Sequence, residues 1–414
     1  MKKLLQNITI VAALMGTSLL PSCLKDSATR TYTLYSPVYK SVAEVRAGIK
    51  SDVPQPVVKP GKIVTLGKYI FLNEVDKGVH IIDNSNPAAP LNKYFVSIPG
   101  NLDLAVKGNV LYADLYRDLV AIDISNPSAI EVKSITKNVF PPRRYNNFFV
   151  ADTTRVIVNW IQKDTTVPHI EQPFFPGGYI YDVAALAMSS VAAPAAIGVS
   201  GSMARFTILN NYLYTVTDNN LNVFDISQAE NPSFTSQKNV GWQIETIFPF
   251  KGNLFIGSQA GVYIFNTSNP TQPGLVSMFG HIRSCDPVIA DDQYAFVTLH
   301  GGTMCGGNLN QLDVLDISNL ASPRNIKSYP LTSPHGLSKD GNLLFICDGE
   351  AGLKVFDATD VANLKLLQTF NGINSYDVIA MNNLAIVVTA DGLYQYDYSN
   401  RGQIILKSKI GYGL

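Results

Sequence analysis

Short apolar runs separated by turn residues recur along most of the chain. Branched and aromatic residues fill such runs at 110–114, 212–216, 343–347 and 384–388. Each run is joined to a second one by residues such as Asn219 and Asn220 or Asp391 and Gly392, which tolerate the positive φ of tight hairpins. The pattern predicts short antiparallel strands connected by hairpins.

The second run of each pair ends on an equivalent polar residue. Residues 119–125 are Leu-Val-Ala-Ile-Asp-Ile-Ser, and related stretches contain Asp83, Asp123, Asp225, Asn266, Asp316, Asp357 and Asp397. A weaker copy at 179–183, with Asp182, fills the one large gap in this series. Four strands repeated at about 40 residues predict an all-β propeller of four-stranded antiparallel blades. Eight blades are the first expectation and seven are the alternative.

The recurring aspartate has a structural explanation. Its carboxylate can accept backbone N–H groups of the following turn, and a later Pro blocks extension of the strand ladder. Because the residue occurs in nearly every repeat, we do not expect it to be an active site.

These repeats resemble the LVIVD repeat of bacterial and archaeal cell-surface proteins. The resemblance is carried by Leu-Val-Ala-Ile-Asp at 119–123, Leu-Asn-Val-Phe-Asp at 221–225 and Leu-Lys-Val-Phe-Asp at 353–357, and it covers residues 61–414. It implies a propeller outside the cytoplasm and brings no catalytic motif with it. The third unit departs from the pattern, which leaves the blade count open.

The N-terminus has the features of an export signal. Lys2 and Lys3 precede an apolar run at 8–20 that is too short to span a bilayer. The following Leu-Pro-Ser-Cys at 20–23 resembles a bacterial lipobox, in which the cysteine is diacylated and becomes the new N-terminus. A Lys-Asp pair at 25–26 is similar to the surface-export signal of Bacteroidetes lipoproteins.

We therefore expect a lipoprotein signal peptide at 1–22, a lipidated tether at 23–60 and the propeller at 61–414. Lipid on Cys23 would anchor the protein in the outer membrane, at the cell surface or in the periplasmic leaflet. Residues 32–39 alternate enough to form a strand that completes the last blade, or they belong to the tether.

The charge composition limits the kind of ligand and suits the predicted fold. Lys and Arg number 32 and Asp and Glu number 32, so the net charge of zero gives no reason to bind nucleic acid. Only 15% of residues are charged, which suits strands that neighbouring blades bury on both faces. We expect a monomer that contacts the membrane through its lipid alone.

The loops differ between the two faces of the predicted propeller. Connections between strands 1 and 2 and between strands 3 and 4 are similar in most repeats, whereas the other connections vary and contain insertions near 162–178 and 300–310. We call the face that carries these variable connections the divergent face. Variable loops are the better place to expect function. Its candidate ligand-binding residues are Arg143, Arg144, Tyr145, His169, Trp242, Glu245, His281, Arg283, Asp286, His300, His335, Tyr376 and Asp377.

Two other roles for these residues stay open. They could cap the first strands and hydrogen-bond to one another around the central channel. His281, His300, His335 and Asp286 are of metal-ligand type, but no paired spacing supports a site, so we expect no metal and no cofactor.

Three cysteines remain once Cys23 is assigned to lipid. Cys285 and Cys305 flank the second insertion, and we expect a disulfide between them in an oxidising envelope. Cys347 lies inside a predicted strand and should be a buried apolar residue.

Motifs for several enzyme classes are absent from the sequence. It contains no Gly-x-Ser-x-Gly, P-loop, Cys-x-x-Cys-His or His-Glu-x-x-His motif. We expect a binding module for an extracytoplasmic glycan, peptide or envelope protein. The alternatives are a structural scaffold, or a polysaccharide hydrolase or lyase that would use carboxylates such as Glu171, Glu245 and Asp286.

Overall fold

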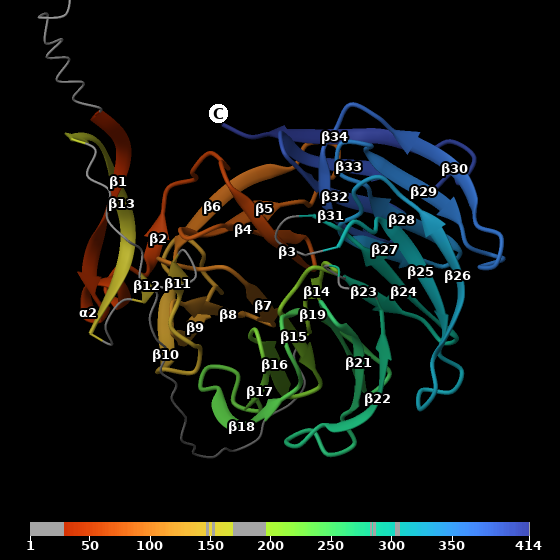
Figure 1. The fold of residues 1–414 in the computed structure, drawn as a ribbon, viewed down its shortest axis with the longest axis horizontal. Helices are drawn as coiled ribbons and strands as arrows, with labels where there is room; N and C mark the ends of the chain where they lie inside the picture. Colours follow the sequence, from red (N-terminus) through yellow and green to blue (C-terminus); the bar gives the residue numbers. More distant parts are fainter. Residues whose placement is uncertain are drawn as a thin grey trace, which may run out of the picture. The chain divides into compact units, whose positions relative to one another are not determined.

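The computed structural model describes residues 29–145, 149–150, 154–168, 196–281, 284, 287–302 and 307–413. Within this part of the chain, seven antiparallel sheets each contain four consecutive strands. Figure 1 shows these sheets as blades around a centre, with the first strand of each blade innermost. The all-β propeller is confirmed; the count of eight blades is wrong, and the alternative of seven is confirmed.

The blades follow one another in chain order. Blades 1 and 2 contain β3 (Pro60–Leu66), β4 (Tyr69–Glu74), β5 (Gly78–Asp83) and β6 (Leu91–Ser97), then β7 (Leu104–Lys107), β8 (Val110–Leu115), β9 (Asp118–Asp123) and β10 (Glu131–Thr136). Blades 3 and 4 contain β15 (Phe206–Leu209), β16 (Tyr212–Val216), β17 (Asn220–Asp225) and β18 (Ser233–Asn239), then β19 (Ile244–Phe250), β20 (Asn253–Ser258), β21 (Gly261–Asn266) and β22 (Gly274–Gly280).

The last three blades are built in the same way. Blade 5 contains β23 (Val288–Ala290), β24 (Tyr294–Leu299), β25 (Gln311–Asp316) and β26 (Arg324–Pro330). Blade 6 contains β27 (Leu337–Asp340), β28 (Leu343–Cys347), β29 (Leu353–Asp357) and β30 (Lys365–Phe370). Blade 7 contains β31 (Ser375–Met381), β32 (Leu384–Thr389), β33 (Gly392–Asp397) and β34 (Ile405–Gly411).

The chain between blades 2 and 3 explains why there is no eighth blade. Its described strands join other sheets: β11 (Arg144–Tyr145) pairs with β12 (Phe149–Val150), and β14 (Val199–Ser200) pairs with β3 of blade 1. Blades 2 and 3 pack directly, with Tyr112 and Phe224 in one buried cluster. The weak repeat copy at 179–183 lies outside the described residues.

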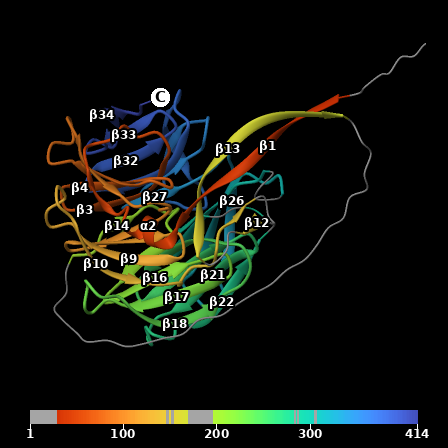
Figure 2. The same ribbon diagram turned by 90° about the vertical axis from the view of Figure 1, so that its left-hand side faces the viewer.

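A separate two-stranded sheet pairs β1 (Thr29–Ser41) with β13 (Arg155–Pro168), and Figure 2 shows the two strands side by side. Residues 32–39 lie in this sheet, while blade 7 takes its four strands from 375–411. The short α2 (Val42–Arg46) follows β1, and β2 (Lys50–Asp52) pairs with β6 at the edge of blade 1. None of the helices in the described ranges has the length and apolar character needed to span a membrane.

The repeated polar residue at the end of each third strand stabilises the turn that follows it. Its side-chain oxygen accepts the backbone N–H of the residue two positions later in all seven blades, at 2.7–3.0 Å. In blade 1, the hydrogen bonds from Ser85 lower the pKa of the Asp83 carboxyl to about 2. The structural role predicted for this residue is confirmed.

Hydrogen bonds link each blade to the next around the whole ring. A side chain near the outer edge of one blade donates to a backbone carbonyl in the loop that follows strand 3 of the next blade. The pairs are Ser51 to Pro127, Ser134 to Glu230, Ser236 to Thr271, Ser277 to Leu320, Tyr329 to Val361, Gln368 to Ile404 and Ser408 to Pro87. The last pair joins blade 7 to blade 1, so the same device closes the ring.

Further contacts hold blades 7 and 1 together. The side chains of Asn84 and Gln395 exchange two hydrogen bonds, at 2.9 and 2.8 Å. Ile63 and Leu72 of blade 1 pack against Ile386 of blade 7 in a buried cluster. The Gly413 N–H also donates to the Val57 carbonyl at 3.0 Å, so side chains and one backbone hydrogen bond close the ring, while β31–β34 alone complete blade 7.

Candidate functional site

The channel at the centre of the propeller is crossed by residues 196–205, which we call the channel segment. Gly198 N–H donates to the carbonyl of Val106 in blade 2 (2.7 Å), and Gly201 N–H donates to that of Ile63 in blade 1 (3.0 Å). Ser202 Oγ accepts the N–H of Leu337 in blade 6 at 2.8 Å, and the Ala204 carbonyl accepts the N–H of Ile247 in blade 4 at 2.9 Å. The segment therefore ties four blades together.

One cavity lies on each side of this segment. Met203 and Arg205 line a cavity of about 510 Å³ at the divergent face, and Val199, Ser200 and Ser202 line a larger one of about 810 Å³ at the opposite face. We call the first the divergent-face cavity. Its other lining residues are Lys62, Asp218, Gln243, Ile244, Glu245, Thr246, Gln259, Pro287, His300, Pro334 and His335.

Charged residues take equivalent places at the start of four innermost strands. In each of these blades the charged residue lies four positions before the last paired residue of strand 1. The four residues are Lys62, Asp103, Arg205 and Asp377. Burial raises the pKa of Asp103 to about 7 and that of Asp377 to about 6, against the opposing effect of Lys62. Burial also lowers the pKa of Lys62. Among the described residues, two cations and two acids thus share a poorly solvated ring; the equivalent residue of blade 5, Asp286, lies outside them.

Asp377 is packed tightly within this ring and is only 3% exposed. Its Oδ1 accepts the N–H of Val378 at 3.0 Å and the hydroxyl of Ser202 at 3.4 Å. Its Oδ2 has no hydrogen-bond partner in the described part of the chain. A Cβ atom on Gly201 or Gly336 would lie 2.1 or 2.2 Å from a carboxylate oxygen of Asp377, so both positions require glycine.

Lys62 presents the other unusual charge. It lines the divergent-face cavity, and its ammonium group makes no hydrogen bond or ion pair with any residue that the structure describes. Arg205, by contrast, holds Asp218 at 3.1 Å through Nη2. An anion entering the cavity would meet Lys62, whose ammonium group has no direct hydrogen bond within the described ranges but already interacts electrostatically with Asp103, Asp377 and Glu245.

Polar and aromatic groups surround this cation. The imidazole rings of His300 and His335 lie 4.7 Å apart, and Tyr376 packs edge-on against His335 at 5.7 Å. Burial lowers the pKa of His335 to about 4 and also lowers that of His300, so both rings are neutral near pH 7. Glu245 Oε1 accepts a hydrogen bond from Gln259 Nε2 at 3.0 Å.

The predicted site residues fall into separate groups. Glu245, His300 and His335 line the divergent-face cavity, while Tyr376 packs behind His335 and Asp377 is buried beside the channel segment. Trp242 is 50% exposed, next in sequence to a lining residue. His281 is partly buried and does not line this cavity.

Arg143 and Tyr145 lie at a different place, beside the β11 segment. Arg143 pairs with Asp76, lies 3.7 Å from Asp114, and stacks 4.6 Å from the centre of the Tyr116 ring. Tyr145 donates to the carbonyl of Ile157 at 3.3 Å. The guanidinium of Arg143 is thus engaged by the protein itself. Arg144 lies in β11, and its side chain lies outside the described part.

Several predictions fall on residues that the structure does not describe. These are the lipidation site Cys23, the disulfide between Cys285 and Cys305, and the ligand candidates His169, Arg283 and Asp286. Cys347 is buried in β28, as predicted. Across the described ranges, no group of three or more His, Cys, Asp or Glu side chains is arranged to hold a metal ion.

Sequence reasoning missed Lys62, Asp103 and Arg205. All three lie immediately before a run of apolar residues that forms an innermost strand. Aligning the repeats on the end of strand 1 would have placed them beside Asp377 and shown charges of both signs at one position. The search for variable loops singled out Asp377 but not the other three: Lys62 lies within β3, and Asp103 and Arg205 directly precede β7 and β15.

Comparisons with known proteins agree with this architecture. Residues 60–96, 101–137, 200–239 and 289–330 match the LVIVD repeat. No curated protein matches the chain.

Solved structures give the same result for the fold. A Lactobacillus plantarum protein, at 13% identity and a TM-score of 0.54, covers 85% of this chain and 96% of its own. Saccharomyces cerevisiae Sqt1, at 11% identity and a TM-score of 0.50, covers 88% of each chain. Likeness at such identities shows the fold alone. The chain is a seven-bladed β-propeller in which four segments match the LVIVD repeat.

Proposed function

We propose that this protein is a lipid-anchored envelope protein whose propeller binds an acidic saccharide in the divergent-face cavity. The observation that carries the proposal is the Lys62 ammonium group, which lines a polar cavity without a direct partner among the described residues. A sugar carboxylate could pair with it, next to Arg205, which holds Asp218 at 3.1 Å.

The remaining lining favours a sugar over an apolar ligand. Glu245, Gln259 and the neutral imidazoles of His300 and His335 offer donors and acceptors to hydroxyl groups. Trp242 is next in sequence to the lining residue Gln243, and its exposed indole could stack on a sugar ring. A volume of about 510 Å³ lies within the range of small-ligand sites.

An array of acidic saccharides, neutral saccharides and peptides tests this function. We expect the purified protein to retain acidic saccharides, and Lys62→Met to weaken that binding at least tenfold. Lys59→Met, at an exposed lysine outside the cavity, is the matched control. If Lys62→Met does not fold, Lys62→Gln replaces it, because it removes the same charge and keeps a polar side chain. Binding of peptides alone, or equal binding by the variants, would contradict the proposal; turnover of a bound sugar would favour the hydrolase or lyase alternative.

The anchor is tested separately. Export and lipidation at Cys23 predict that the protein fractionates with membranes and that Cys23→Ser releases it. Protease treatment of intact cells then distinguishes the two leaflets, because a propeller at the cell surface is cleaved and a periplasmic one is protected. Membrane association that survives Cys23→Ser would refute the lipid anchor.

A further inference from the structure

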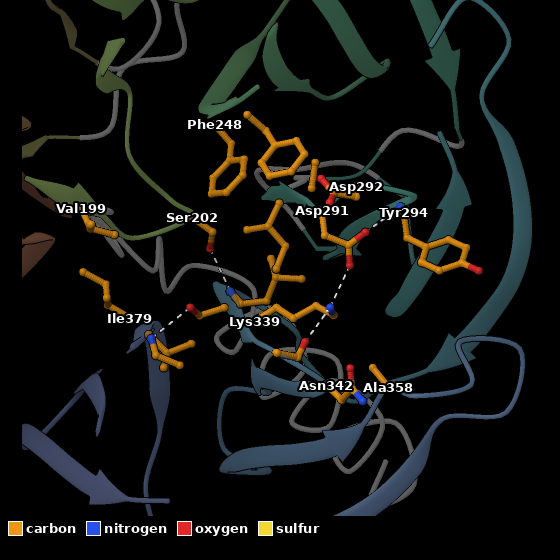
Figure 3. A pocket seen from close by; sticks show the side chains of 18 of the residues that line it. Val199, Ser202, Phe248, Asp291, Asp292, Tyr294, Lys339, Asn342, Ala358 and Ile379 are labelled. Carbon is orange, nitrogen blue, oxygen red and sulfur yellow. Dashed lines mark hydrogen bonds and ion pairs between the residues drawn. The ribbon is translucent and has the colours of Figure 1, made fainter. Parts of the chain in front are cut away.

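The larger cavity, of about 810 Å³, lies at the mouth of the channel opposite the proposed saccharide site. Its walls come from the innermost strands of blades 4–7 and from Val199, Ser200 and Ser202 of the channel segment. Figure 3 shows Val199, Phe248 and Ile379 around it. Nothing in the proposed function uses this space.

The position of the channel segment explains why the cavity exists. Val199 and Ser200 pair with Thr65 and Val64 of β3, and Ile197 forms a bridge to Lys107 of β7. The segment thus covers the innermost strands of blades 1 and 2 at this level. It leaves β19, β23, β27 and β31 facing an open space.

Apolar side chains form much of the wall. Phe248 and Phe250 of β19 are partly exposed, whereas Ile289 and Ile379 lie behind this surface, already buried in clusters between neighbouring blades. Val199 faces the space from the channel segment and is 46% exposed. Filling this space would remove apolar surface from water, which favours an apolar occupant.

The charged residues at the mouth are already paired with one another. Lys339 Nζ lies 2.8 Å from Asp291 Oδ2 and donates to the Gly341 carbonyl at 2.7 Å (Figure 3). Lys251 pairs with Asp292. Two positive and two negative groups therefore cancel, and a charged ligand would gain little here. Ser338 can hydrogen-bond to a ligand, since its Oγ accepts the Ala380 N–H at 3.0 Å and keeps its own proton to donate.

We infer that this cavity is a second binding site, for an uncharged and mostly apolar small molecule that carries one or two hydrogen-bonding groups. The apolar walls supply affinity, and the Ser338 hydroxyl orients the ligand. The site differs from the divergent-face cavity in its chemistry and in its lining residues, so the two sites bind different classes of molecule.

Fluorescence titration with N-phenyl-1-naphthylamine, an uncharged probe that brightens in apolar surroundings, tests the inference on the purified protein. We expect saturable binding to the unaltered protein and at least tenfold weaker binding to Val199→Trp, whose larger side chain fills the cavity. Val53→Trp is the matched control, because Val53 is 68% exposed and lines neither cavity. It should bind the probe as the unaltered protein does.

Two results would overturn the inference: no saturable binding, or equal binding by Val199→Trp and Val53→Trp. If Val199→Trp does not fold, Phe250→Ser takes its place, since it removes an apolar wall without adding volume. Lys62→Met should leave probe binding unchanged, so the failure of one site is distinguishable from the failure of the other.

Discussion

At the scale of single residues, the main feature is buried charge around the channel. Asp103 and Asp377 remain in a region where burial raises the pKa of each carboxyl, and Lys62 and Arg205 supply the opposite charge. Such groups cost stability when ionised unless they are fully paired, and Asp377 Oδ2 lacks a partner in the described chain. Charge that does not serve the fold is a reason to expect a ligand there.

The pH dependence of stability tests the burial of Asp377. The unfolded carboxyl loses its proton near pH 4, whereas the folded one keeps it until a pKa of about 6. The unfolded state therefore binds fewer protons in this window, and the stability of the natural protein falls as pH rises through it. Relative to the natural protein, Asp377→Asn should gain up to about 3 kcal/mol between pH 4 and pH 7. Urea unfolding at both pH values measures this; a constant difference would show that the carboxyl is solvated.

The turn aspartates make a second prediction at this scale. Asp357 accepts the Thr359 N–H at 2.9 Å and the Thr359 hydroxyl at 2.6 Å. Asp357→Ala should lower the free energy of unfolding by about 1 kcal/mol, because both donors lose their acceptor. Asp357→Asn keeps an oxygen at the same place and should lose less. Equal losses in the two variants would argue against the hydrogen bonds as the cause.

At the scale of elements, the channel segment organises the centre of the molecule. It binds the innermost strands of four blades and contributes residues to both cavities. The sequence predicted an unusual region between blades 2 and 3, because the repeat weakens there. It could not predict the path of residues 196–205, since extended backbone inside a channel has no hydrophobic period of its own.

Two glycine substitutions, one in this segment and one outside it, test how closely the segment is packed. Gly201→Ala would place Cβ 2.1 Å from Asp377 Oδ2, in a region where neither group can move freely. We expect a loss of about 2–4 kcal/mol in the free energy of unfolding. Gly274→Ala, with no heavy atom within 4 Å of the new Cβ, is the control and should change stability little. Similar small effects at both positions would mean that the segment is loosely held.

At the scale of the whole molecule, equivalent links between successive blades produce a closed propeller. Ser51 and Ser408 complete the series at the junctions on either side of blade 1. The sequence predicted the blades well, because the aspartate turns repeat and each blade has the same four strands. The number of blades was less predictable, because an insertion that keeps a trace of the repeat looks like a blade until the sheets are seen.

A double-mutant cycle tests ring closure. Asn84→Ala and Gln395→Ala each break the reciprocal hydrogen bonds between blades 1 and 7 and leave the other amide without this partner. Each should cost about 1–3 kcal/mol in the free energy of unfolding, and the double variant should lose less than the sum by about 1–2 kcal/mol. Strict additivity would show that this pair does not hold the two blades together.

The sequence also predicted the candidate site only in part. Divergent loops pointed to His300, His335 and Glu245, which meet at one cavity. They also pointed to Arg143, which the protein uses to bind its own Asp76. Sequence variability does not distinguish a ligand contact from an internal ion pair. The residue most suited to hold an anion, Lys62, lies on a strand and carried no signal in the loops.

The most direct test of the account is a crystal structure of the protein with the acidic saccharide that binds it most tightly. We predict that the sugar lies in the divergent-face cavity, with its carboxylate in hydrogen-bonding distance of Lys62 Nζ and its hydroxyls near Glu245 and the two histidines. A saccharide bound on the outer blades or at the opposite mouth, with the divergent-face cavity empty, would contradict the account.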